Sequence, residues 1–184
     1  RKDISTGEIL APILASGRNA PLPSNQIYAL ASDGYNLYIG TQQGARKWDG
    51  TQTTSFGQGS SWQTRPTQFY DFAVDASISG GFIYAGTNIG VCKYSIATMG
   101  VSDCQNVYDG MPNWATYSVS YDSNYVYGGT TSGVGLITKS NFQHDYNWGE
   151  GTQTENAVVE IMGDIAYIGT DGLGVLRYNI TSNE

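Results

Sequence analysis

Short alternations of apolar and polar residues, rather than a helical pattern, run through the whole sequence. Four of them end in an aromatic-rich run followed by a Gly-Thr step, at Gly40-Thr41, Gly86-Thr87, Gly129-Thr130 and Gly169-Thr170. An alternation with a period of two predicts half-buried β-strands. No segment sustains a 3.6-residue period, so we expect an all-β chain with almost no helix.

The Gly-Thr steps are separated by 46, 43 and 40 residues. A repeat in this range, roughly 40 to 50 residues, is typical of a four-stranded β-propeller blade. A length of 184 residues suits one domain. The sequence therefore predicts a single four-repeat β-propeller domain over 1–184, with repeats at approximately 22–57, 66–108, 111–148 and 152–181.

Each repeat divides into strands at its turn residues. The second strand ends at the Gly-Thr step, and the third follows a hairpin in which glycine supplies the positive φ that a tight turn needs. The candidate first strands are 27–30, 69–74, 117–119 and 158–161. The candidate outer strands are 51–57, 101–108 and 142–148. We therefore expect blades of four antiparallel strands.

The fourth repeat has no candidate outer strand of its own. A spare apolar segment, GEILAPIL at 7–14, precedes the first repeat. Pairing it with the third strand of the last blade, around 175–179, would cover an unpaired edge. This strand can complete the last blade of its own chain or that of a neighbouring copy, and the sequence leaves both open.

The first repeat has the largest set of matching motif positions. They are Leu22-Pro23, Asn25, Ile27, Leu30, Asp33, 37–41, Gly44 and Trp48-Asp49. This repeat resembles the propeller repeat in the periplasmic sensor regions of bacterial two-component regulators, over about 29 residues closely and over the other repeats more loosely. The resemblance implies a blade architecture, whereas fold alone does not imply a sensor function.

The charge of the chain narrows the range of partners. With 9 Lys and Arg against 16 Asp and Glu the net charge is −7, and the basic residues are scattered rather than gathered in a stripe. We therefore expect neither nucleic acid nor an anionic membrane as a partner. No run approaches the roughly 18 apolar residues of a membrane span.

Cys92 and Cys104 are the only cysteines, and the turn-like segment 97–100 lies midway between them. A simple hairpin places the two opposite each other, which favours a cross-strand disulfide over two buried free thiols. Because disulfides persist in oxidising compartments, we expect a secreted, periplasmic or cell-surface protein. Two cysteines without a nearby histidine do not make a zinc site, and we expect no metal and no cofactor.

Aromatic and amide residues in the loops ahead of the first strands are the candidate ligand-binding residues. Pro23, Pro66 and Pro112 mark equivalent positions before these strands, so the loops should lie on one face. Tryptophan with asparagine or glutamine is suited to stacking on a sugar and hydrogen bonding to it. The candidates are Asn25, Gln26, Trp62, Gln68, Asn113, Trp114 and Asn156. In the competing interpretation the tryptophans pack between blades.

The sequence shows no catalytic constellation. The single histidine, His144, falls in a candidate outer strand without a nucleophile motif nearby, and spacing singles out no carboxylate pair. Aspartates after the first strands fit turn acids better than calcium ligands. They are Asp33, Asp75, Asp122 and Asp164. Asn179-Ile180-Thr181 is an N-glycosylation sequon.

These patterns favour a non-catalytic binding module for a glycan or a protein. The alternative is a structural subunit of an extracellular filament or surface assembly, in which the N-terminal strand enters a neighbouring copy. A carbohydrate-active enzyme, a hydrolase or lyase, is the distant third hypothesis.

Overall fold

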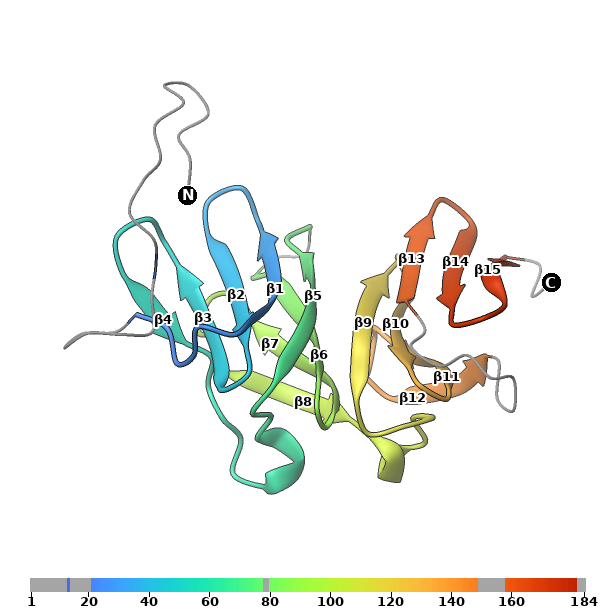
Figure 1. The fold of residues 1–184 in the computed structure, drawn as a ribbon, viewed down its shortest axis with the longest axis horizontal. Helices are drawn as coiled ribbons and strands as arrows, with labels where there is room; N and C mark the ends of the chain where they lie inside the picture. The colour runs from blue at the N-terminus through green and yellow to red at the C-terminus, as the bar shows by residue number, and fades with distance from the viewer. Residues whose placement is uncertain (1–12, 14–20, 78–79, 149–157, 182–184) are drawn as a thin grey trace.

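The computed structural model describes residues 13, 21–77, 80–148 and 158–181. These residues form four antiparallel sheets, each a meander of strands in sequence order (Figure 1). We number the sheets blades 1 to 4. Blade 1 contains β1 (Ile27–Ser32), β2 (Leu37–Thr41), β3 (Gly44–Trp48) and β4 (Thr53–Ser55). Blade 2 contains β5 (Phe69–Asp75), β6 (Phe82–Thr87), β7 (Gly90–Ser95) and β8 (Val101–Gln105).

Blade 3 contains β9 (Thr116–Tyr121), β10 (Tyr125–Thr130), β11 (Gly133–Thr138) and β12 (His144–Trp148). Blade 4 contains β13 (Val158–Met162), β14 (Ile165–Thr170) and β15 (Gly174–Asn179). Helical structure in the described ranges amounts to two single 3₁₀ turns, η1 (Trp62–Thr64) and η2 (Val107–Asp109). The predicted all-β architecture of four repeats is confirmed.

The threonine of each Gly-Thr step closes the hairpin that follows it. The Thr41 hydroxyl donates to the Gly44 carbonyl at 2.8 Å and accepts the Gln43 amide at 3.1 Å. Gly44 has a φ of 122°, which glycine adopts without strain. Thr87, Thr130 and Thr170 donate in the same way to Gly90, Gly133 and Gly174. The repeated motif is therefore a hairpin closure.

The glycine of the same step lets the next blade approach closely. A Cβ added to Gly40 would lie 2.8 Å from the carbonyl oxygen of Phe69, and one added to Gly86 would lie 2.7 Å from that of Thr116. Those carbonyls belong to the innermost strands of the following blades. Close packing leaves no room for a methyl group at such a distance.

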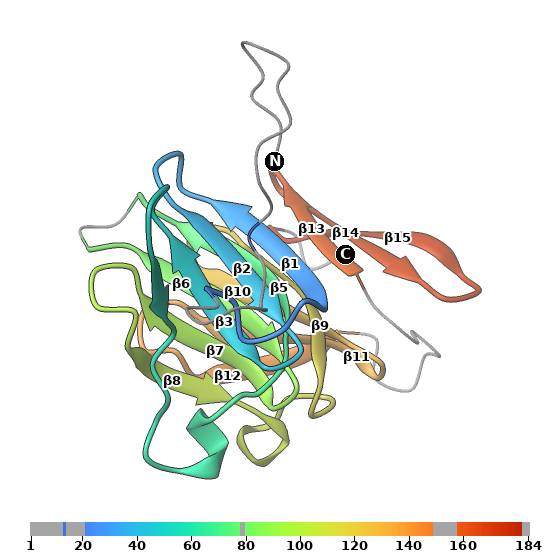
Figure 2. The same cartoon turned by 60° about the vertical axis from the view of Figure 1, so that its left-hand side comes forward.

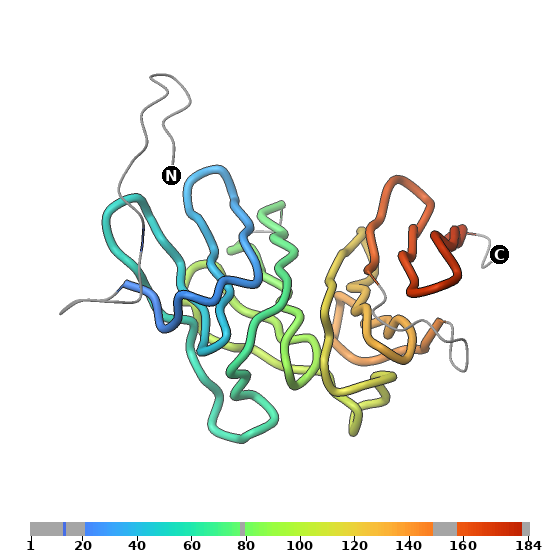
Figure 3. The backbone as a smooth tube through the Cα atoms, in the orientation of Figure 1, coloured from blue at the N-terminus to red at the C-terminus, as the bar shows by residue number. Residues whose placement is uncertain are grey.

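The hydrophobic core lies between successive blades. Tyr38 of blade 1 packs with Phe69 and Phe72 of blade 2 in one cluster. Separate clusters join blade 2 to blade 3 and blade 3 to blade 4. The innermost strands contact one another in the order β1, β5, β9, β13. The chain thus follows an arc of stacked sheets, with blade 1 and blade 4 at its two ends (Figure 3).

All three predicted outer strands are shorter than the sequence-based expectation. The strand predicted over 51–57 is confined to β4, Thr53–Ser55. The strand predicted over 101–108 ends at Gln105, because Asn106 and Asp109 form a capping box that starts η2. The strand predicted over 142–148 begins at His144, since Phe142 has a left-handed φ of 54°. The predicted N-terminal strand, 7–14, falls outside the described residues apart from Ile13, so its pairing stays a prediction.

Candidate functional site

The loops that precede the innermost strands of blades 1 to 3 lie on one face of the molecule. Each is tied to the second hairpin of its own blade. The Gln26 carbonyl accepts the Gln42 amide at 3.1 Å. The Asn88 side chain accepts the amides of Thr67 and Gln68, each at 3.0 Å. We call this end of the blades the loop face; the loops before β5 and β9 lie along the lower edge of Figure 1.

Three aromatic side chains from three separate segments meet on the loop face. Trp62 begins η1, Tyr108 is in η2, and Trp114 lies just before β9. Their ring centroids are 5.7 Å apart for Trp62 and Trp114, 5.9 Å for Trp62 and Tyr108, and 5.1 Å for Tyr108 and Trp114. The Trp62 and Tyr108 side chains are 56% and 70% exposed, although aromatic rings of this size are usually buried. We call this group the aromatic cluster.

A row of three tyrosines crosses the innermost strands near the same face. The ring of Tyr70 lies 5.6 Å from that of Tyr28 and 4.9 Å from that of Tyr117. Each tyrosine sits where the register of its strand shifts, between the paired residues Ile27 and Ala29 in the case of Tyr28. A bulge of this kind leaves one residue unpaired and redirects its side chain. We call these residues the tyrosine row.

Electrostatics in the tyrosine row follow from its crowding. Burial, and then the neighbouring Tyr117 and Tyr28 rings, raise the pKa of Tyr70 above its ordinary value. The Tyr70 hydroxyl donates to the side-chain oxygen of Gln68. The row presents phenol rings beside an amide, a surface suited to stacking and hydrogen bonding.

The structure brings together some of the sequence-predicted site residues. Trp62 and Trp114 meet in the aromatic cluster, and Gln68 contacts the tyrosine row. Asn25 and Gln26 are exposed ahead of β1. Asn156 lies outside the described residues. The competing interpretation, in which tryptophans pack between blades, holds for buried Trp148 of blade 3.

Asn113 has a structural role in the loop before β9. Its amide nitrogen donates to the hydroxyls of Thr131 at 2.7 Å and Ser132 at 3.1 Å. Its side-chain oxygen accepts the Trp114 amide at 2.6 Å. These bonds hold the loop that presents Trp114.

Tyr108 and the tyrosine row were missed by the sequence analysis. The sequence pattern predicts Tyr108 in an outer strand, whereas the capping box of Asn106 and Asp109 ends that strand before it. The same pattern predicts the three tyrosines of the row as ordinary strand residues. Aligning the repeats on their threonines places Tyr28 and Tyr117 at one position, 13 residues before the threonine. Tyr70 lies 17 residues before Thr87, because the turn before β6 is longer.

The opposite end of the blades has an open pocket of about 570 Å³ near Lys139. The Lys139 ammonium donates to Asp75 at 2.7 Å and to the Asp122 carbonyl at 2.8 Å, and lies 4.7 Å from the centre of the Tyr121 ring. It therefore joins blades 2 and 3. The described residues contain no group of three or more His, Cys, Asp or Glu side chains that could hold a metal ion.

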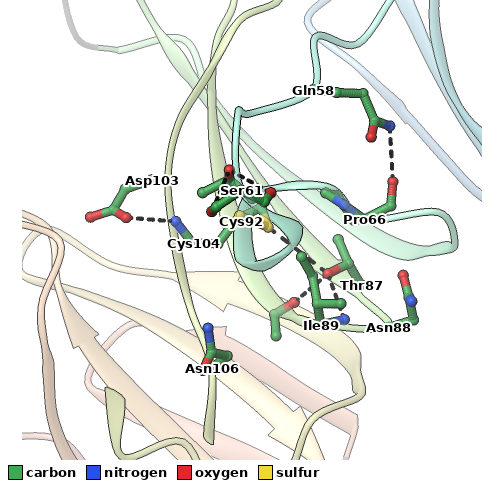
Figure 4. The surroundings of a disulfide bond; sticks show 12 residues. Gln58, Ser61, Pro66, Thr87, Asn88, Ile89, Cys92, Asp103, Cys104 and Asn106 are labelled. Carbon is green, nitrogen blue, oxygen red and sulfur yellow. Dashed lines mark hydrogen bonds between the residues drawn. A yellow bond between two sulfur atoms is a disulfide. The ribbon is translucent and has the colours of Figure 1, made fainter. Parts of the chain in front are cut away.

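Cys92 and Cys104 form a disulfide across β7 and β8, as predicted from their spacing. The two residues are register partners with their Cα atoms 4.0 Å apart. Figure 4 shows Gln58, Ser61 and Pro66 around the bond, all from the loop that carries η1. The disulfide therefore lies next to the segment that positions Trp62.

Comparison with known proteins gives a fold but no family. No family model and no curated protein sequence matches the chain. The computationally designed protein Ika4 superposes over 94% of this chain and 99% of its own, with a TM-score of 0.65 and 15% identity. U3-55K superposes over 86% of this chain and 50% of its own, with a TM-score of 0.71 and 10% identity.

A third similar structure bears on the predicted repeat family. It is the extracellular domain of the hybrid two component system BT3049 from B. thetaiotaomicron, with a TM-score of 0.66 and 19% identity. The match covers 87% of this chain but only 24% of that one. Among the described residues, no helix has the length and apolar character needed to cross a membrane. The order of the strands, the packing of the blades and these likenesses together identify the chain as a β-propeller built from four blade repeats.

Proposed function

We propose that this β-propeller is a non-catalytic binding module exported from the cell, and that the aromatic cluster on its loop face contacts a glycan. The observation that carries the proposal is the exposure of Trp62 and Tyr108 beside Trp114. Exposed aromatic rings on a rigid scaffold offer flat apolar surface for the faces of a sugar, with polar atoms at their edges.

The scaffold around the cluster is rigid. η2 has a capping box at Asn106 and ends at Gly110, which has a φ of 109°. The loop carrying Trp114 is fixed by Asn113, and the loop carrying Trp62 lies against the disulfide. Ordered loops lose little conformational entropy when a ligand binds.

Export is supported by the disulfide, because such bonds persist in oxidising compartments. Two of the similar structures, BT3049 and BT4673, are named as extracellular domains. A secreted, periplasmic or cell-surface location is consistent with both observations.

Binding to a panel of polysaccharides, measured on a glycan array and by titration calorimetry, tests the proposal. We expect Trp62→Ala and Trp114→Ala each to weaken binding by a factor of roughly 5 to 150, since stacking on an aromatic ring contributes on the order of 1–3 kcal/mol. Tyr35→Ala is the matched control, because Tyr35 is 92% exposed in the turn at the opposite end of blade 1. Absence of binding across the panel, or binding that the tryptophan variants leave unchanged, would refute a glycan ligand and favour a protein.

A structural subunit of an extracellular assembly is the second candidate. It is favoured by blade 4, where β15 is the edge of a three-stranded sheet while the other three sheets have four strands. A strand donated by a neighbouring copy would pair with that edge. Deleting 7–14 would then abolish assembly and leave a folded monomer, and a peptide of that sequence would bind to it.

A further inference from the structure

Each blade has two faces, and side chains from different positions of the repeat form each face. The front face carries the tyrosine three residues before the hairpin threonine and packs on the next blade. Tyr38, Tyr84 and Tyr127 occupy this position in blades 1 to 3, and all three are fully buried. The back face packs on the preceding blade. The same interface therefore occurs three times within the chain.

Among the described residues, no sheet packs on the front face of blade 4. Val134 of blade 3 is 1% exposed, but its counterpart Val175 in blade 4 is 66% exposed. The tyrosine at the repeated position, Tyr167, is half-buried and its ring lies 6.0 Å from the Arg177 guanidinium. Val158 and Met162 on the same face are also exposed.

Gly169 shows the same vacancy at the closest point of approach. It is the counterpart of Gly40 and Gly86, where a Cβ would meet the backbone of the next blade at 2.8 and 2.7 Å. A Cβ at Gly169 would meet only its own sheet neighbour Val158, at 3.7 Å. Blade 4 thus has the glycine that permits close approach in blades 1 and 2, but among the described residues no strand of another blade approaches it.

The back face of blade 1 is the complementary half of this interface. Phe72, Val119 and Val159 occupy its central position in blades 2 to 4, and each is buried against the preceding blade. Their counterpart in β1, Leu30, is 64% exposed. Ile39 on β2 is already buried, so the exposure is confined to the innermost strand, where successive blades contact each other.

Blade 4 does not cover blade 1 of its own chain. β1 and β13 make no extensive contact within the described ranges, and the two blades stand at opposite ends of the arc in Figure 1. Figure 2 shows β13, β14 and β15 as the last sheet of the stack. The arc also superposes on about half of longer chains, 47% of the designed protein Ika8 and 50% of U3-55K.

We propose that a second copy of this chain completes the ring. Blade 1 of each copy packs its back face on the front face of blade 4 of the other, so that two copies form a closed ring of eight blades with twofold symmetry. The interface is the one already repeated three times in each chain. Leu30 of one copy then lies against Gly169 and Val158 of its partner, as Phe72 lies against Gly40 and Ala29.

Substitution of Gly169 by valine tests the proposal on the full chain. A Cβ at this position lies 3.7 Å from its nearest described heavy atom in a single copy, but in the ring it would meet the backbone of the partner blade, and the γ carbons of valine add to that clash. Light scattering after size-exclusion chromatography should give about 40 kDa for the wild type, twice the 19.8 kDa of one chain, and about 20 kDa for Gly169→Val.

A second variant, on the back face of blade 1, distinguishes loss of the interface from misfolding of Gly169→Val. Leu30→Glu places a charge on an exposed position of β1 and should also give about 20 kDa with an unchanged far-ultraviolet spectrum. Trp62→Ala is the control and should stay at about 40 kDa, which separates the ring from the proposed ligand site. A wild type of 19.8 kDa at every concentration, an open series of larger masses, or a dimer that neither variant dissociates would overturn the proposal.

Discussion

Single carboxylates at the turns stabilise the blades. The Asp33 side chain accepts the Asn36 amide at 2.6 Å and the Tyr38 hydroxyl at 2.7 Å. Burial alone raises the pKa of Asp33, but these hydrogen bonds hold it well below the ordinary value. Burial has the same effect at Asp75, where the bond from Lys139 keeps the pKa lowered. Both residues are the turn acids that the sequence predicted.

The lowered pKa values predict loss of stability in acid. A group whose pKa is depressed by folding stabilises the protein above its unfolded pKa, about 3.9 for aspartate, and this contribution is lost as the pH falls. We therefore expect the urea midpoint of the wild type to drop between about pH 5 and pH 2. The double variant Asp33→Asn, Asp75→Asn should show a smaller drop. Equal drops in both proteins would contradict this assignment.

At the residue scale, the sequence predicted residues with a local role better than residues whose role depends on distant parts of the chain. The Gly-Thr steps correctly located the end of the second strand in each blade. The threonine closes the hairpin that follows, and the glycine leaves room for the next blade in blades 1 and 2. The tyrosine row depends on bulges, and the phase shift that one inserted residue causes is not evident in strands as short as β1, β5 and β9. The role of Asn113 depends on Thr131 and Ser132 in another hairpin, which no local pattern reveals.

At the element scale, the disulfide joins the two outer strands of blade 2. It closes a short loop, because the cysteines are 12 positions apart in the sequence. Such a loop is expected to stabilise the fold by about 3 kcal/mol through the unfolded chain. The double variant Cys92→Ala, Cys104→Ala should therefore melt roughly 6–12 °C lower, and reductant should not change its melting temperature further.

Mass spectrometry supplies the check on this prediction. Freshly purified wild type should contain no free thiol. Two free thiols in the wild type would show that the bond does not form. An equal melting temperature for the double variant, the reduced wild type and the oxidised wild type would show that the bond has no stabilising role. A loss of polysaccharide binding on reduction would in addition link the bond to the Trp62 loop.

The inner strands were predicted well and the outer strands poorly, for a physical reason. β1, β5, β9 and β13 are in contact with neighbouring blades, so burial imposes an alternating pattern on them. β4 has only the residues Thr53–Ser55, which are largely exposed, and burial imposes little pattern there. The turn at η2 was set instead by the polar capping of Asn106 and Asp109.

At the scale of the whole molecule, the number of blades in the chain and the number in the ring are separate quantities. The four sequence repeats predict four blades in the chain and leave the number of blades in the ring open. The exposed faces of blades 1 and 4 favour the larger ring, because each exposes positions that are buried at three equivalent places in the same chain. The repeats reveal that the blades stack in sequence order. The number of blades in a closed ring depends on the rotation between neighbouring blades, which side-chain packing sets.

Electron microscopy of the purified full-length chain tests this account most directly, by counting blades in averaged views along the ring axis. The account predicts closed rings of eight blades with twofold symmetry, and open arcs of four for Gly169→Val. Closed rings of four blades in the wild type would contradict it, since blade 4 would then pack on blade 1 of its own chain.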